Sequence, residues 1–208
     1  MSAGIAFWRE LKPLILASQS SARADLIRQT RIPFIVEAAE IDEREAEAPL
    51  RKSGAGAREI GAHLARAKAR AVAARHPDQL VLGADQTLAL DDRLFTKPAN
   101  REAALEQLRA LSGREHQLHS AICIVRAEQV LFETIETARM QMRPLSEAFL
   151  AEYADTAGAA LTASVGAYQV EGVGIHLFEH IAGDHATILG LPLIPLLAFL
   201  RRNGSLLG

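Results

Sequence analysis

Short apolar runs alternate with longer amphipathic segments along most of the chain. A short apolar run bounded by turn residues is typical of a buried strand, whereas apolar residues at helical spacing predict a helix. Strands are therefore predicted at residues 14–17, 34–36, 80–84, 87–90, 93–95, 116–125, 130–142 and 175–181. Helices are predicted from residues 18–21 to about residue 30, and at residues 57–75, 101–111, 146–154 and 191–202. The strand–helix alternation predicts an α/β fold, and the two hairpins make its sheet mixed.

Residues 57–75 form the longest predicted helix. Its buried stripe is predicted from apolar residues at helical spacing, namely Ile60, Leu64, Ala67 and Ala71. Lys68 lies one turn after Leu64, at the edge of this stripe. The acidic run at residues 40–45, which precedes the helix, predicts a loop.

Composition narrows the class of protein. The chain has 208 residues, of which 49% are hydrophobic, so it suits one compact α/β domain, or two lobes sharing one sheet, and not a disordered chain. Lys and Arg number 23 against 25 Asp and Glu, and this balance argues against broad binding to nucleic acid. Cys123, the one cysteine, lies in an apolar run, which predicts a buried strand residue and excludes an internal disulfide. No apolar run is long enough for a membrane span and no signal-peptide pattern is present, so we expect a cytoplasmic protein.

Polar residues that could take part in binding or catalysis follow two of the predicted strands. Ser18 to Arg23 combines hydroxyl groups, backbone N–H groups at a helix start and a guanidinium, which together suit an anion. Asp85 follows the apolar run 80–84 directly, at the end of a strand where open α/β sheets build sites. An ordinary helix cap and a turn aspartate are the alternative interpretations.

Two lysines and an acidic pair extend this set. Lys68 and Lys97 lie at the edges of predicted elements and are compact charges that suit phosphates, although each also fits a surface position. Asp42 and Glu43, together with Asp85, could hold Mg²⁺, which prefers oxygen ligands. A solvated acidic loop is the alternative.

In their order along the chain, these features resemble the Maf family of nucleotide pyrophosphatases, also called septum-formation-inhibitor-like proteins. The resemblance runs from Leu14 to about Leu200. The matching stretches are Leu16-Ala17-Ser18-Gln19-Ser20 with Arg23, Ile41-Asp42-Glu43, Ala67-Lys68-Ala69, Leu82-Gly83-Ala84-Asp85, Lys97-Pro98, Leu111-Ser112-Gly113-Arg114, Gly166-Ala167-Tyr168, Glu171-Gly172 and Gly190-Leu191-Pro192. The resemblance implies a single domain over residues 1–208, with an elongated mixed sheet, flanking helices and two lobes around a cleft, as in inosine-triphosphatases.

The resemblance also implies an activity, which is hydrolysis of nucleoside triphosphates to a monophosphate and pyrophosphate with a divalent cation, Mg²⁺ or Mn²⁺. It assigns catalytic positions to Ser20, Arg23, Glu43, Lys68, Asp85 and Lys97. Glu43 and Asp85 would hold the metal, and Asp85 would orient or deprotonate the attacking water. The cationic side chains would neutralise the triphosphate and the leaving pyrophosphate.

Three further positions concern the choice of base. This sequence has Ala22, Gln86 and Glu171 where the dTTP- and UTP-hydrolysing branch has arginine, threonine and glutamine. The branch similar to 7-methyl-GTP pyrophosphatase has tryptophan, glutamine and glutamate. Gln86 and Glu171 therefore favour 7-methyl-GTP, because a glutamate suits the donor edge of guanine and the positive charge of the methylated base. Ala22 cannot provide the aromatic face that would stack on that cation.

Three other interpretations stay open. A nucleotidyltransferase also begins with a strand and a phosphate loop, but such loops depend on glycines that residues 18–23 lack. A regulator of septum formation would hold a nucleotide without hydrolysing it, and would not need both Glu43 and Asp85. A plain structural α/β domain would make these charges incidental. We expect a nucleoside triphosphate and neither nucleic acid nor a membrane as partner; the choice between monomer and homodimer is left open.

Overall fold

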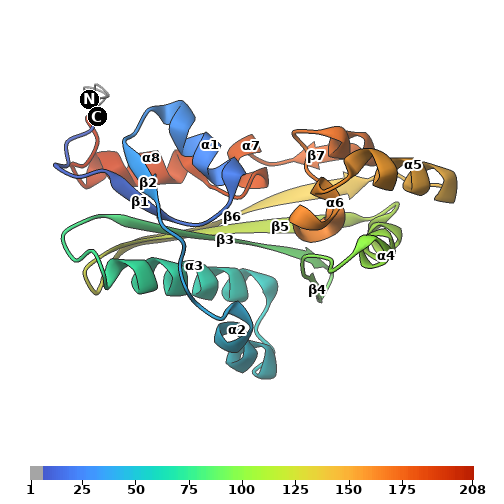
Figure 1. The fold of residues 1–208 in the computed structure, drawn as a ribbon, viewed down its shortest axis with the longest axis horizontal. Coiled ribbons are helices and arrows are strands. Elements are labelled where there is room, and N and C mark those ends of the chain that lie inside the picture. Colours follow the sequence, from blue (N-terminus) through green and yellow to red (C-terminus); the bar gives the residue numbers. More distant parts are fainter. Residues whose placement is uncertain (1–6) are drawn as a thin grey trace. The chain divides into compact units, whose positions relative to one another are not determined.

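The structure, a computed structural model, describes residues 7–208 (Figure 1). The chain divides into two compact units. Unit 1 comprises Met1–Gln86, Ser120–Glu136 and His185–Gly208, and unit 2 comprises Thr87–His119 and Thr137–Asp184. The expectation of a single domain with two lobes around a cleft stays a prediction.

The secondary structure is an alternation of strands and helices. The strands are β1 (Leu14–Ala17), β2 (Phe34–Val36), β3 (Val81–Leu90), β4 (Arg93–Phe95), β5 (Glu115–Arg126), β6 (Gln129–Met142) and β7 (Phe178–Ala182). The α-helices are α1 (Ser21–Thr30), α2 (Glu43–Lys52), α3 (Ala57–Ala73), α4 (Arg101–Leu111), α5 (Glu147–Ala157), α6 (Ala160–Ala163), α7 (His185–Ile188) and α8 (Leu193–Arg202). Two 3₁₀ helices, η1 (Val165–Ala167) and η2 (Val173–Leu177), precede β7. No helix within residues 7–208 has both the length and the apolar stretch that crossing a membrane requires.

The strands form one sheet in the order β2-β1-β3-β5-β6-β7, with β4 paired to β3. β1 runs parallel to β2 and to β3, whereas the pairs β3–β4 and β6–β7 are antiparallel. The prediction of a mixed α/β fold with a central sheet and flanking helices is confirmed.

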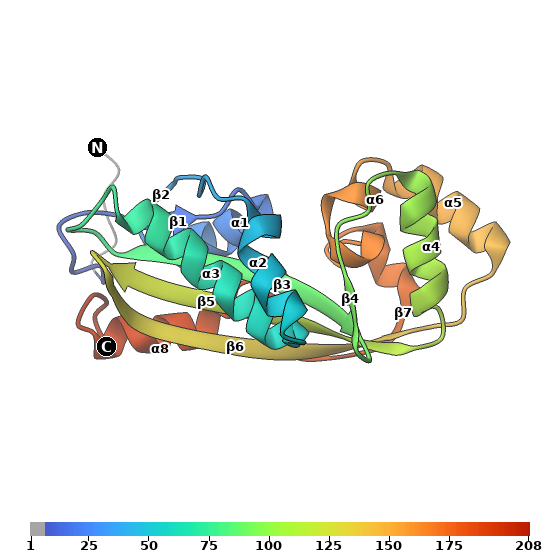
Figure 2. The ribbon, with the colours of Figure 1, turned by 90° about the horizontal axis from the view of Figure 1, so that it is seen from below.

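Unit 1 buries both faces of β1. Alternate residues of β1 point to opposite faces, as strand geometry requires. Leu14 and Leu16 pack with residues of α1 and α8 on one face. Ile15 and Ala17 pack with α3 on the other face, together with Cys123, which is buried in β5 as predicted. Figure 2 shows α3 lying along this second face.

The buried stripe of α3 differs from the prediction. Ala65 and Ala69 are fully buried, whereas Ala67 and Ala71 are only partly buried. The reason is the close approach of α3 to Gly83 of β3, where an added Cβ would lie 2.1 Å from the carbonyl oxygen of Ala65. Helical spacing gives the period of a stripe, but the contact with β3 selects which residues face inward.

Three further predictions need correction. Residues 40–45 are not a loop throughout, because α2 begins at Glu43 with Asp42 as its N-cap. Asp85 does not end its strand, because β3 continues to Leu90 and pairs with β4 there. The strand predicted at 175–181 begins only at Phe178, since the preceding residues form η2.

Unit 2 contains a buried aromatic cluster around His116. The Nε2 atom of His116 and the hydroxyl of Tyr168 form a hydrogen bond of 2.7 Å. The ring of Tyr168 also meets Phe178 edge-on, with centroids 4.9 Å apart. Burial lowers the pKa of His116 to about 4, so its imidazole is neutral at pH 7. The cluster therefore packs without charge.

Candidate active site

The turn between β1 and α1 is built around two serine hydroxyls. Ser20 is the N-cap of α1, and its Oγ accepts a hydrogen bond of 3.4 Å from the backbone N–H of Arg23. The buried Ser18 accepts one of 3.3 Å from the N–H of Ser20. The predicted capping of this helix is confirmed, while a catalytic role for Ser20 stays a prediction.

Arg23 connects three segments of unit 1. Its Nη1 donates to the hydroxyl of Ser18 and to the carbonyl oxygen of Ala84, both at 3.0 Å, and its Nε donates to the carbonyl oxygen of Gly190 at 2.9 Å. Gly190 has a φ of +93°, and a Cβ there would lie 3.1 Å from the Arg23 Nε. Glycine is therefore needed at this position for its backbone conformation and to leave room for the guanidinium.

Asp85, Lys68 and Glu43 form an ionic cluster. The Lys68 Nζ lies 2.6 Å from an Asp85 oxygen and 2.8 Å from a Glu43 oxygen. Asp85 is only 6% exposed and the Lys68 side chain 12%, whereas the Glu43 side chain is 54% exposed. One ammonium thus joins a buried carboxylate to one that faces solvent.

The electrostatics of the cluster depend on burial. Burial raises the pKa of Asp85, and the charges of Lys68 and Arg23 oppose that rise. Burial also lowers the pKa of Arg23, and Asp85 and Glu43 oppose that shift. A guanidinium nevertheless stays protonated in proteins. The result is a carboxylate that holds a proton more tightly than usual beside two fixed positive charges.

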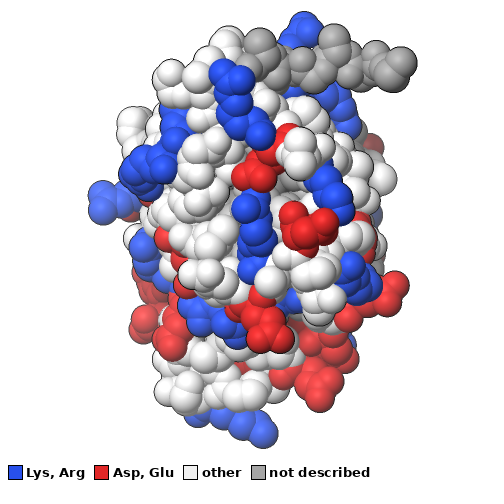
Figure 3. Space-filling view, turned by 90° about the vertical axis from the view of Figure 1, so that its left-hand side faces the viewer, with Lys and Arg blue, Asp and Glu red and all other residues white. Residues whose placement is uncertain are grey.

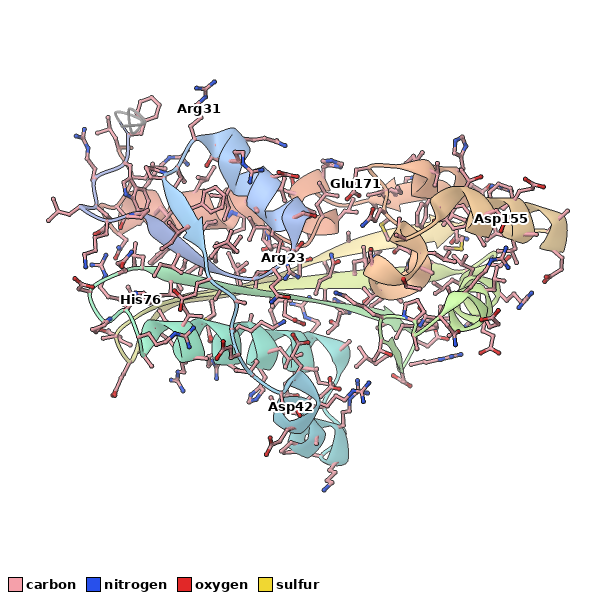
Figure 4. All side chains as sticks on the ribbon, in the orientation of Figure 1. Arg23, Arg31, Asp42, His76, Asp155 and Glu171 are labelled. Atoms are coloured by element: carbon pink, nitrogen blue, oxygen red, sulfur yellow. The ribbon has the colours of Figure 1, made fainter. Side chains whose placement is uncertain are left out.

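The start of α2 positions Glu43. Asp42 caps the helix, with its Oδ1 accepting hydrogen bonds of 2.9 and 3.1 Å from the N–H groups of Arg44 and Glu45 (Figure 4). Asp42 is thus occupied with the backbone, and Glu43, the next residue, reaches Lys68. This separates the acidic pair into a capping residue and a residue of the ionic cluster.

The carboxylates fit one kind of metal site. In residues 7–208, no group of three or more His, Cys, Asp or Glu side chains could hold a metal ion. Glu43 and Asp85, however, share one ammonium and therefore lie close together. Mg²⁺ is commonly held by one or two carboxylates together with substrate phosphates and water. The pair fits a cation that binds with a phosphorylated ligand, and does not fit a cage built from protein alone.

Gln86 points to the opposite face of β3 from Asp85. Its Nε2 donates to the Ser120 hydroxyl at 2.9 Å and to the main-chain carbonyls of Thr187 and Ile188 at 3.2 and 2.9 Å. The fully buried Ser120 in turn donates to the Thr187 carbonyl at 2.7 Å. Ser120 was not among the predicted site residues, although a serine within the apolar strand 116–125 is a visible signal.

Three further candidate residues, Ala22, Lys97 and Glu171, make no contact with the ionic cluster that the structure records. Ala22 is in the first turn of α1 and partly buried. Lys97 and Glu171 belong to unit 2, where both are exposed: Lys97 follows β4, and Glu171 lies between η1 and η2 (Figure 4). The structure brings Ser20, Arg23, Glu43, Lys68 and Asp85 together in unit 1, and the roles of Lys97 and Glu171 stay predictions.

On the face drawn in Figure 3, charged side chains do not gather into a patch of one sign. Figure 3 shows basic and acidic side chains interspersed over one face of the molecule. The cluster itself holds two carboxylates against the ammonium of Lys68 and the guanidinium of Arg23, so it is balanced before a ligand binds.

The structure thus places cationic and acidic groups beside the first strand and helix of a mixed α/β fold, an arrangement that suits a phosphorylated ligand. The family model described as "Maf-like protein" matches residues 13–203, and the chain belongs to this family. The chain is 57% identical over 194 residues to a nucleoside triphosphate pyrophosphatase of Bradyrhizobium diazoefficiens, covering 93% of this chain and 95% of the relative. It is 50% identical over 195 residues to a 7-methyl-GTP pyrophosphatase of Rhizobium etli, covering 94% and 98%. A solved dITP/XTP pyrophosphatase of Mycobacterium abscessus is similar with a TM-score of 0.40 and 19% identity, over 64% of this chain and 76% of that one.

Proposed function

We propose that this Maf-family chain is a nucleoside triphosphate pyrophosphatase, a hydrolase of acid anhydrides, with Asp85, Lys68, Glu43 and Arg23 at its reaction centre. The observation that carries the proposal is the ammonium of Lys68 bound to both carboxylates, with Asp85 buried. The relative from Bradyrhizobium, described as a nucleoside triphosphate pyrophosphatase, supports the same activity.

Asp85 suits the role of general base. In the reaction, a water oxygen forms a bond to the α-phosphorus, the bond from that phosphorus to the oxygen bridging to the β-phosphate breaks, and pyrophosphate leaves. The proton of the water passes to an oxygen of Asp85. Because burial raises the pKa of this carboxyl, it accepts a proton more readily than an exposed aspartate does.

The cationic groups suit the charge that develops. Lys68 and Arg23 would stabilise negative charge on the phosphate oxygens, and Arg23 is pre-oriented by Ser18, Ala84 and Gly190. Because the cluster is electrically balanced, a triphosphate needs further positive charge. Lys97 would provide part of it. Glu43 and Asp85 would hold a divalent cation, Mg²⁺ or Mn²⁺, whose contribution is to neutralise phosphate oxygens.

For the substrate, we propose 7-methyl-GTP. Gln86 and Glu171 support this choice through the resemblance, and the Rhizobium relative is described as a 7-methyl-GTP pyrophosphatase. Ala22 argues against it, since it offers no aromatic face to a methylated base. The proposed enzyme is cytoplasmic and acts on free nucleotides. Removing modified nucleotides before they enter nucleic acid would be its purpose.

Pyrophosphate release by the purified protein tests the activity and the substrate together. The panel comprises 7-methyl-GTP, GTP, dTTP, UTP and 5-methyl-UTP, each with Mg²⁺ or Mn²⁺. We expect release from 7-methyl-GTP to have the highest kcat/KM. Preference for dTTP or UTP would keep the activity and overturn the choice of base. Binding without release from any nucleotide would overturn the enzyme and favour a nucleotide-binding regulator of septum formation.

Glu171→Gln sharpens the substrate proposal. The amide removes the negative charge that would attract a cationic base, so we expect the preference for 7-methyl-GTP over GTP to fall about tenfold. Glu179→Gln, at another exposed glutamate of unit 2, is the matched control and should keep the preference. An unchanged ranking of substrates in Glu171→Gln would remove Glu171 from base recognition.

A further inference from the structure

Gln86 is exceptional within its strand. All ten residues of β3 are described, and nine of them are buried; Gln86 alone is partly exposed. A glutamine in the middle of a buried strand needs partners for its amide, because an unpaired buried polar group is costly. The partners of Gln86 therefore show which part of its side chain is committed to the protein and which part is left for a ligand.

All three partners contact the nitrogen of the amide. They are the hydroxyl oxygen of Ser120 and the main-chain carbonyl oxygens of Thr187 and Ile188, at 2.9, 3.2 and 2.9 Å. The carbonyls can only accept. Ser120 uses its own proton at the Thr187 carbonyl, 2.7 Å away, so its oxygen accepts from Gln86.

This arrangement decides the orientation of the amide. Reversing it would bring the oxygen of Gln86 against two main-chain carbonyls, with no hydrogen between them. The NH₂ group must therefore face Ser120 and α7, and its two protons are fully used. Because the amide is planar, its carbonyl oxygen Oε1 points away from these groups, and it can accept a hydrogen bond but cannot donate one.

We propose that Ser120 and the α7 turn lock the amide of Gln86 so that it acts toward the nucleotide as a hydrogen-bond acceptor only. The ligand group that it recognises is an N–H or O–H donor, on the base or on the sugar. Ser120 is a positioning residue, because it acts through Gln86. This inference rests on the proposed function. It adds that Gln86 accepts the hydrogen bond and that the ligand donates it.

Four nucleotides separate the two sources of the donor. GTP carries base and sugar donors, 1-methyl-GTP and ITP each lack one base donor, and 2′,3′-dideoxy-GTP lacks both sugar hydroxyls. In the wild-type protein, we expect kcat/KM to fall about three- to tenfold for the analogue that lacks the recognised donor. A fall with a base analogue assigns the donor to the base, and a fall with 2′,3′-dideoxy-GTP assigns it to the sugar.

Variants then connect that loss to the amide. In Gln86→Ala the ratio of kcat/KM between GTP and the affected analogue should approach one. Gln79→Ala is the matched control, since this buried glutamine also donates to a main-chain carbonyl, that of Pro13 at 3.1 Å, and it should keep the wild-type ratio.

Ser120→Ala tests the positioning role. Two carbonyl partners remain, so the ratio should fall to a value between that of the wild type and that of Gln86→Ala. Ser205→Ala is its control, because this equally buried serine also makes two side-chain hydrogen bonds, with Glu10 and Asn203. A general loss of stability would lower kcat/KM for GTP and for the analogue together and leave their ratio unchanged. The ratio therefore isolates the positioning effect.

The outcomes separate this inference from the proposed function. Pyrophosphate release from GTP by the wild type tests the function alone. If none is released, the dissociation constants of the four nucleotides, measured by calorimetry, replace kcat/KM in every ratio. The inference is overturned by equal values for all four nucleotides in the wild type, by a wild-type ratio in Gln86→Ala, or by a protein that binds none of them. A wild-type ratio in Ser120→Ala overturns the positioning role.

Discussion

Two buried polar groups, one in each unit, meet the cost of burial in opposite ways. In unit 1, burial raises the pKa of Asp85, and the charges of Lys68 and Arg23 oppose that rise. In unit 2, His116 gives up its charge and pairs with the hydroxyl of Tyr168. A buried charge is costly unless it is paired with an opposite charge, whereas a buried neutral group costs less and needs only a hydrogen bond. The comparison indicates chemistry at Asp85 and packing at His116.

The strongest way to break this comparison is to neutralise Asp85. Asp85→Asn keeps the shape of the side chain and an oxygen for Lys68 but removes the proton acceptor, so we expect kcat to fall about a thousandfold. Pyrophosphate release measures the loss, and circular dichroism checks the fold. Asp78→Asn, at an exposed carboxylate paired with Lys12, should keep wild-type activity. Activity within about threefold of wild type in Asp85→Asn would remove the general base from the proposal.

Removing the ammonium tests whether Lys68 opposes the raised pKa of Asp85. Lys68→Met should lower kcat/KM about a hundredfold at pH 7. Lys68 opposes the raised pKa of Asp85, so its loss raises that pKa further. Because only the deprotonated carboxylate accepts a proton, the acidic limb of the pH profile of kcat/KM should move to higher pH. Lys12→Met should leave the profile in place, and an unmoved limb in Lys68→Met would contradict the coupling.

Acid should destabilise the fold through His116. Its pKa is about 4 in the folded protein against 6.5 for an unperturbed histidine, so the unfolded chain binds the proton first as pH falls. This contribution to stability is complete above pH 6.5 and is lost toward pH 4, amounting to about 2 kcal/mol between pH 7 and pH 5. Urea unfolding across this range measures it.

His116→Phe isolates this contribution. The variant should lose that part of the pH dependence. His180→Gln, at an exposed histidine of the same unit, should keep it. Identical pH dependence in wild type and His116→Phe would contradict the assignment.

The smallest effect is expected at the partner of His116. Tyr168→Phe removes one buried hydrogen bond and should lower the free energy of unfolding by about 1 kcal/mol. Its kcat/KM should stay within about twofold of wild type, because the pair serves packing. Urea unfolding and pyrophosphate release together check both statements, and a tenfold loss of activity with an unchanged fold would give the cluster a functional role.

Most of the fold could be predicted from the order of residues. The apolar runs predicted β1, β2, β5 and β6, and the hydroxyls within residues 18–21 predicted a capped start for α1. The loop predicted for the acidic segment before α3 was wrong, because Asp42 caps a helix there. A run of charged residues fits a loop or a solvated helix equally well, and only the capping contacts decide between them.

For the candidate site, the sequence provided the residue types and missed their support. Arg23, Lys68 and Asp85 were recognisable as charged residues beside apolar elements. Ser18, Ser120 and the carbonyl of Gly190 were not assigned their contacts, because hydrogen bonds between residues distant in sequence leave no local pattern. The assignment of Asp85 to a strand end was wrong, and its catalytic role stays a prediction. Its burial and its ion pair with Lys68 do not depend on the strand ending there.

What the sequence determined by itself was period and composition: which segments are helices or strands, and which carry charge. The tertiary structure alone decided which face is buried and which charges meet. Because α3 approaches β3 closely at Gly83, Ala65 and Ala69 are the residues of α3 that face inward. The main-chain carbonyls of Thr187 and Ile188 in α7 determined the orientation of the Gln86 amide. Periodicity is a property of neighbouring residues, whereas the dielectric environment and the partners of a buried polar group depend on segments that only folding brings together.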